Sequence, residues 1–173
     1  MDQTAKTIGY LFAVHVLGML AMSACRLVLL FANIPEAGID WSLAGHAMLL
    51  GLKFDNFIGC YIAALPCVVL PVLALTCTGR VSEIAAKISS WWFGILYTLV
   101  LFIEVANARY FHFFENHFTI GITEWFGFVG DTAGMVFGDA TNWLFLAIAI
   151  VLIALYILAL RAITRTYITR LNN

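Results

Sequence analysis

Four charged residues lie within long apolar stretches of the sequence: Arg26, Asp55, Glu104 and Arg109. An ionisable side chain in the hydrocarbon of a membrane costs about 2.5–3.5 kcal/mol or more unless it is paired or wetted. Each of these residues therefore needs a partner nearby. Two cations and two anions can neutralise one another, and an arginine can also bind the phosphate of a lipid head group through its planar guanidinium.

Glu104 and Arg109 belong to an apolar stretch that begins with Trp91 and Trp92. If these tryptophans sit at one membrane interface, a rise of about 1.5 Å per residue places Glu104 past the middle of a hydrocarbon core of about 30 Å. Arg109 then lies near the far face. A topology of four spans places Arg26 and Asp55 in the same half of the membrane, so the sequence predicts that the four charges gather there.

Two interpretations of this cluster stay open. In the first, the charges form a structural polar cluster whose mutual pairing lowers the cost of desolvation. In the second, the cluster faces a wet cleft that holds a lipid head group, with Lys53 and Tyr110 at its rim. The candidate head-group residues are then Arg26, Lys53, Asp55, Glu104, Arg109 and Tyr110.

Signatures of other chemistry are missing from the sequence, which contains no Ser-His-Asp set, phosphate-binding Gly-rich loop or HExxH motif. His112 and Glu115 share a helix face, but His117 is five residues from His112 and points elsewhere, which argues against a metal site. The four cysteines lie in or beside apolar runs without a CxxC pair and are predicted to be small buried hydrophobic residues. We therefore expect no catalytic residue, cofactor or metal in this chain.

The composition is that of a membrane protein. Of the 173 residues, 63% are hydrophobic and 11% are charged, whereas a soluble domain carries about 25% charged residues. The net charge of -1 argues against a nucleic acid as a partner. The expected partner is instead the phospholipid bilayer.

Four apolar runs are long enough to cross a bilayer, since a helix needs about 20 residues to do so. Pro66 and Pro71 within the second run are expected to kink it by removing two backbone donors. The predicted fold is an all-α polytopic bundle of about four transmembrane helices with interfacial amphipathic helices. The spans are about 8–32, 57–76, 91–114 and 143–160, and the interfacial segments are about 42–55, 80–89 and 116–140.

The placement of the cations predicts the orientation, because Lys and Arg concentrate in cytoplasmic loops. On this topology six cations fall on one side of the membrane, and the loops on the other side hold mostly acids. Both termini are therefore expected in the cytoplasm. The six cations are Lys6, Arg80, Lys87, Arg161, Arg165 and Arg170.

Three short motifs follow one another along the chain. Arg26-Leu27 stands near the end of the first span, Gly51-Leu-Lys-Phe-Asp55 opens the second, and Glu104-Val-Ala-Asn-Ala-Arg-Tyr-Phe-His-Phe-Phe114 ends the third. Together they resemble the N-terminal membrane domain of the lipoteichoic acid synthase-like phosphotransferases of the sulfatase superfamily, in the branch found in Gram-negative bacteria such as the Bacteroidetes. That family has GLRFD-like and YFRFF-like motifs, so Lys53 and His112 stand where Arg is common.

The resemblance implies an anchor in the bacterial cytoplasmic (inner) membrane, attached to an extracytoplasmic alkaline phosphatase-like domain. Such a domain moves phosphoglycerol or phosphoethanolamine from a phospholipid to an acceptor glycan or lipid, using a Thr nucleophile and a divalent metal, typically manganese. Residues 1–173 hold the transmembrane domain, so this catalytic ectodomain is absent from the chain and would be its partner in the complete protein. About four spans leave the C-terminus on the wrong side for an ectodomain, and one further crossing after Asn173 is expected.

The alternative is a stand-alone small polytopic membrane protein, such as a transporter subunit or a scaffold. In that case the same charges serve as structure or as a proton path. Internal inverted repeats would favour a transporter, and the two halves show no convincing self-similarity.

Overall fold

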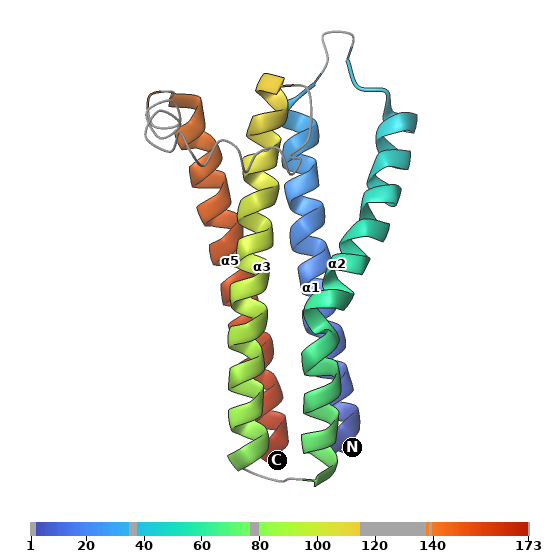
Figure 1. The fold of residues 1–173 in the computed structure, drawn as a ribbon, viewed down its shortest axis with the longest axis vertical. Helices are drawn as coiled ribbons and strands as arrows, with labels where there is room; N and C mark the ends of the chain where they lie inside the picture. Colours follow the sequence, from blue (N-terminus) through green and yellow to red (C-terminus); the bar gives the residue numbers. More distant parts are fainter. Residues whose placement is uncertain (1–2, 35–37, 77–79, 115–137, 139, 173) are drawn as a thin grey trace, which may run out of the picture.

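The computed structural model describes residues 3–34, 38–76, 80–114, 138 and 140–172. Four long helices make up this part: α1 (Gln3–Ala32), α2 (Trp41–Thr76), α3 (Arg80–Phe114) and α5 (Ala140–Asn172). They run alternately up and down, so that both termini lie at one end of the bundle (Figure 1). We call this end, where α2 also ends and α3 begins, the terminal end, and the opposite end the loop end. The prediction of an all-α bundle with four membrane-spanning helices is confirmed.

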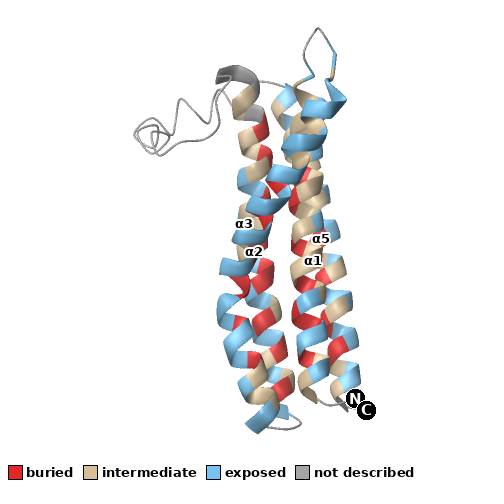
Figure 2. Cartoon of the chain, turned by 90° about the vertical axis from the view of Figure 1, so that its right-hand side faces the viewer, coloured by how far each residue is buried: buried red, intermediate tan, exposed pale blue. Residues whose placement is uncertain are grey.

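Each of the four helices is long and apolar enough to cross a membrane. Large apolar side chains face outward on all of them, and Leu49 and Trp91, for example, are 70% and 71% exposed. Cys60 and Cys67 are exposed as well, contrary to the prediction that the cysteines are buried, because lipid accepts a thiol as readily as a protein core does. Figure 2 shows buried residues where the helices meet and exposed residues on the outer surfaces. The bundle thus has the surface of a protein that lipid surrounds.

The interfacial helices predicted at 42–55 and 80–89 are not separate elements. Residues 42–55 form the first half of α2, which continues into the predicted span without a break. Residues 80–89 begin α3 in the same way. Neither junction contains a proline, and a helix continues where nothing removes its backbone hydrogen bonds. Most of the third predicted segment, 116–140, lies outside the described residues.

The start of α2 is set by an N-cap. Asp40 Oδ1 accepts hydrogen bonds from the backbone N–H groups of Ser42, at 2.9 Å, and Leu43, at 3.2 Å. The buried residues of α2 begin ten positions into the helix, at Gly51. In Figure 1 this first part of α2, drawn in cyan, leans away from the other helices.

Pro66 and Pro71 lie inside α2, and the helix continues through both. A proline lacks the N–H that would bond the carbonyl four residues earlier, so Pro66 leaves the Ile62 carbonyl without its usual donor. The indole Nε1 of Trp92 on α3 donates a hydrogen bond to that carbonyl oxygen at 2.9 Å. A neighbouring helix thus replaces the missing donor, as membrane helices with proline require. Of the two tryptophans expected at the interface, Trp92 therefore turns toward α2, while Trp91 stays exposed.

Aromatic side chains fill the core toward the terminal end. Tyr97 of α3 packs against Phe93 and against Tyr156 of α5, with ring centroids 6.4 and 5.3 Å apart. Tyr10 of α1 stacks on Tyr167 of α5 at 4.5 Å. Within the described residues α1, α3 and α5 each contact the other two, whereas α2 contacts α1 and α3 but not α5.

Hydroxyl groups link the helices around these rings. Thr7 Oγ1 and Tyr167 OH are 2.8 Å apart, and Tyr10 OH lies 3.3 Å from Thr164 Oγ1. Thr164 in turn donates a hydrogen bond to Ser90 Oγ at 3.1 Å. A buried hydroxyl without a partner costs about 1–3 kcal/mol, so these bonds make the polar groups of the core compatible with their burial.

Candidate functional site

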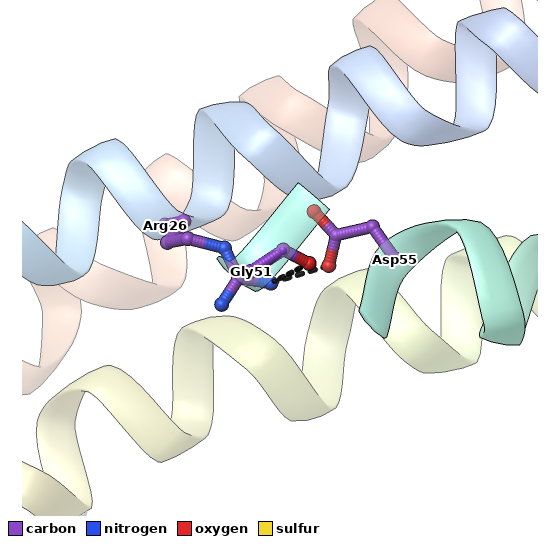
Figure 3. A network of polar contacts seen from close by, with 3 residues as sticks. All are labelled: Arg26, Gly51 and Asp55. Carbon is purple, nitrogen blue, oxygen red and sulfur yellow. Dashed lines mark hydrogen bonds and ion pairs between the residues drawn. The ribbon is translucent and has the colours of Figure 1, made fainter. Parts of the chain in front are cut away.

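Arg26 and Asp55 form an ion pair between α1 and α2 (Figure 3). Arg26 Nη2 donates hydrogen bonds to Asp55 Oδ1 and, at 3.3 Å, to the carbonyl oxygen of Gly51. The Asp55 side chain is fully buried, and the Arg26 side chain is 25% exposed. Because Arg26 lies in the last quarter of α1, the pair lies toward the loop end.

Gly51 makes the space in which Arg26 reaches Asp55. The two α2 residues share one helix face, since four positions separate them. The guanidinium of Arg26 lies so close to Gly51 that a Cβ there would overlap it. Gly51 and Asp55 are the first and last residues of the Gly-Leu-Lys-Phe-Asp motif, and Arg26 opens the Arg-Leu motif. Two motifs that are separate in the sequence therefore meet in space.

The ion pair leaves two buried polar atoms without a hydrogen-bond partner in the described part of the chain, Arg26 Nε and Asp55 Oδ2. Native proteins satisfy most such atoms with protein groups or with water. An unsatisfied buried group costs about 1–3 kcal/mol, and more when it is charged. The pairing of Arg26 with Asp55 therefore does not satisfy every polar atom of the two side chains among the described residues.

Glu104 approaches the same region from α3. Its side chain is half-buried and has interactions of its own. The thiol of Cys25, a buried residue next to Arg26, lies within electrostatic range of Glu104, Asp55 and Arg26. Of the four charges singled out in the sequence, Arg26 and Asp55 are thus paired, and Glu104 lies on α3 near Cys25. Arg109 belongs to α3, but its side chain lies outside the described part of the structure.

The two residues predicted at the rim are placed differently from each other. Lys53 is exposed and lies on the opposite side of α2, because two residues correspond to about 200° around a helix. The structure thus does not bring it to the face that Gly51 and Asp55 share. Tyr110 is half-buried on α3, about two turns beyond Glu104, and has interaction partners.

Metal-ligating side chains do not gather anywhere in the described residues, where no group of three or more could hold an ion. The side chain of His112, and residues Glu115 and His117, lie outside that part.

A second polar layer, not predicted from the sequence, lies nearer the middle of the bundle. His15 Nε2 and Asn56 Oδ1 are 2.9 Å apart between α1 and α2. The Tyr97 phenol is fully buried beside them, and its OH has no hydrogen-bond partner among the described residues. Its ring lies against Gly18, where a Cβ would overlap it, and a Cβ at Gly59 would meet its OH at 3.2 Å. The sequence contained a signal for this layer, because a histidine in an apolar span is a candidate functional residue and glycines often lie where helices pack closely.

Comparisons of the chain with protein-family models, with curated proteins and with solved structures found no match. Fold and site together define a class, an all-α multi-pass membrane protein with a buried ion pair between its first two helices. Any assignment finer than this class rests on the sequence motifs and on the geometry of the site.

Proposed function

We propose that this bundle anchors a phosphotransferase of the lipoteichoic acid synthase-like sulfatase family and presents the phospholipid donor to it. The observation that supports this most is the Arg26–Asp55 pair, which holds an arginine side chain that is a quarter exposed inside a membrane-spanning bundle. The head groups phosphoglycerol and phosphoethanolamine both carry a phosphate, and a guanidinium binds phosphate in a bidentate geometry. The meeting of the Arg-Leu and Gly-Leu-Lys-Phe-Asp motifs at this pair is a second support, because these motifs carry the family resemblance.

The residues of the site have different roles in this proposal. Arg26 contacts the phosphate. Asp55 is fully buried, so it does not contact the phosphate and instead orients the guanidinium through Oδ1. Asp55 and Glu104 are both anionic, so a phosphate near them needs more positive charge than Arg26 supplies. We expect Arg109 to be the second cation, and it stays a predicted head-group residue together with Tyr110.

The orientation belongs to the same proposal. The terminal end carries the cations Lys6, Arg80, Lys87, Arg161, Arg165 and Arg170, so the positive-inside rule assigns it to the cytoplasm of a bacterial inner membrane. The Arg26–Asp55 pair then lies in the outer half of the membrane, on the side where an extracytoplasmic enzyme would act.

The catalytic ectodomain of the family would supply the Thr nucleophile and the divalent metal, typically manganese. The described residues of this chain do not fit such a metal, because no three of their ligating side chains come together. The proposal therefore assigns this chain the binding of the lipid and no chemical step.

The experiment that tests the anchor role is to determine the source gene beyond the codon for Asn173. A frame that continues into a further apolar run and a soluble domain with a Thr and several Asp and His residues supports the proposal. A stop codon directly after Asn173 contradicts it and favours the stand-alone alternative.

A test of the site uses the complete enzyme that such a frame encodes. Arg26→Gln is expected to lower transfer from lipid donors at least tenfold while hydrolysis of a soluble ester by the ectodomain stays unchanged. Arg80→Gln removes an exposed cation far from the pair and should leave both activities intact. Equal loss of both activities in Arg26→Gln, or loss of neither, argues against a head-group role.

The stand-alone alternative also has one observation in its favour. The His15–Asn56 layer and the Arg26–Asp55 pair place polar groups from the middle of the bundle toward the loop end, as a proton path requires. Substrate uptake or proton flux in vesicles that contain this chain alone would support the alternative, and an anchor would show neither.

A further inference from the structure

A groove runs between α3 and α5 from the terminal end toward the middle of the bundle, on a surface that the head-group site does not share. Its volume is about 1110 Å³. Its walls are apolar, with Ile95, Leu99 and Phe102 on α3 and Ile153 and Ile157 on α5. Ile95 and Leu99 are more than half exposed. In a membrane such a groove is filled by an apolar chain.

Cations line the groove at its terminal end. Lys87 of α3 and Arg161 and Arg165 of α5 all belong to its lining. Lys87 forms an exposed ion pair with Glu83 at 2.7 Å. In the described part of the chain neither arginine has a carboxylate within ion-pair distance, and both are exposed. The rim therefore carries two guanidinium groups that can bind an anion.

The length of the groove fits one leaflet of a bilayer. From Trp91, which lies at the cationic end, to Phe102 the helix rises about 16 Å, close to half of a hydrocarbon core of about 30 Å. Cations at the membrane surface with an apolar slot of leaflet depth behind them match the shape and charge of an anionic lipid.

We propose that this groove binds one anionic diacyl phospholipid of the leaflet at the terminal end. Its phosphate lies between Arg161 and Arg165, and an acyl chain lies along the walls formed by α3 and α5. A second copy of this chain does not fit as the occupant, because it would bring the same cations against this rim. The inference is independent of the proposed function, since it involves the other leaflet and other helices.

The test measures lipid binding by the purified chain in detergent, using native mass spectrometry with dioleoyl phosphatidylglycerol and dioleoyl phosphatidylcholine as probes. The chain is expected to retain one phosphatidylglycerol at least tenfold more strongly than phosphatidylcholine. Arg161→Gln combined with Arg165→Gln should abolish this preference. The matched control, Arg80→Gln combined with Arg170→Gln, removes two exposed cations from the same end outside the groove and should keep it.

A further variant tests the shape of the groove independently of the charge at its rim. Thr98 lines the groove, so Thr98→Trp should narrow it and lower retention of phosphatidylglycerol without a change in net charge. Far-ultraviolet circular dichroism checks that this variant keeps its helix content, and the two charge variants decide the matter if it does not. Equal loss in both charge variants, no preference in the unchanged chain, or displacement of the lipid by millimolar inorganic phosphate would each overturn the proposal.

Discussion

Asp55 shows how a single carboxylate is tolerated among lipid-facing helices. It is fully buried, its partner Arg26 comes from the neighbouring helix, and Gly51 leaves room for the guanidinium. Removal of one partner of a buried pair leaves an uncompensated charge, which typically costs about 3–5 kcal/mol. The ion pair is therefore expected to fix how α1 and α2 pack.

Gly51→Ala tests whether the packing of α1 and α2 depends on the Arg26–Asp55 pair, without removing a charge. The added methyl group must displace the guanidinium from Asp55, and we expect the free energy of unfolding to fall by about 1–3 kcal/mol. Gly45→Ala on the same helix is the control, because nothing lies within 4 Å of a Cβ there. It should be neutral, or stabilising by up to about 1 kcal/mol through helix propensity. Unfolding titrations with sodium dodecyl sulfate in mixed micelles measure both, and equal values would contradict the argument.

At the site, sequence reasoning could find the charges but not their pairing. Depth along each apolar run placed Arg26 and Asp55 in the same half of the membrane, and the structure brings them together. Which side chains meet depends on the rotation of each helix about its axis, which apolar runs do not encode because lipid and protein neighbours are both apolar. The position of Lys53 on the far side of α2 is an example.

At the scale of helices, α2 contains two prolines, and α3 supplies a hydrogen bond at the first of them. The Trp92 indole replaces the N–H that Pro66 lacks. The centres of the spans could be predicted from apolar length. The ends of the helices could not be predicted in this way, because a polar residue sets a helix boundary only where it caps or breaks the helix. Asp40, which caps the start of α2, is such a residue.

A double-mutant cycle tests whether the Trp92 indole replaces the backbone N–H that Pro66 lacks. Trp92→Phe should cost about 1–3 kcal/mol of unfolding free energy, because the Ile62 carbonyl loses its partner. Pro66→Ala restores the backbone donor to that carbonyl, so the same Trp92→Phe change should cost much less in this background. Trp91→Phe, at an exposed position, should change stability by less than about 0.5 kcal/mol. Strictly additive effects of the Trp92 and Pro66 changes would refute the link.

For the whole molecule, composition alone predicted the class, because a chain with so few charges cannot be stable in water. The alternation of the four helices places the end of α1 and the start of α2 at one end of the bundle, and the end of α2 and the start of α3 at the other, with both termini. The structure defines which helix ends lie together, and the positive-inside rule predicts that the cationic end faces the cytoplasm.

Reporter fusions check this assignment. Alkaline phosphatase fused after Asn173, or inserted within 77–79, should be inactive, whereas green fluorescent protein at the C-terminus should fluoresce. Alkaline phosphatase inserted within 35–37 should be active, because that segment is expected outside the cytoplasm. An active phosphatase at the C-terminus would reverse the orientation and place the Arg26–Asp55 pair in the cytoplasmic half.

Within the described residues α1, α3 and α5 contact one another, while α2 contacts α1 and α3 but not α5, and this arrangement has a consequence for biosynthesis. Because α2 is synthesised before α3 and α5, it crosses the membrane before the core that these two helices form with α1 is complete. Until α3 has crossed the membrane, the Ile62 carbonyl has no indole to bond, and α2 can be held by α1 alone. The Arg26–Asp55 pair and the His15–Asn56 contact need only α1 and α2, so we expect them to hold these two helices together before α3 and α5 have been inserted.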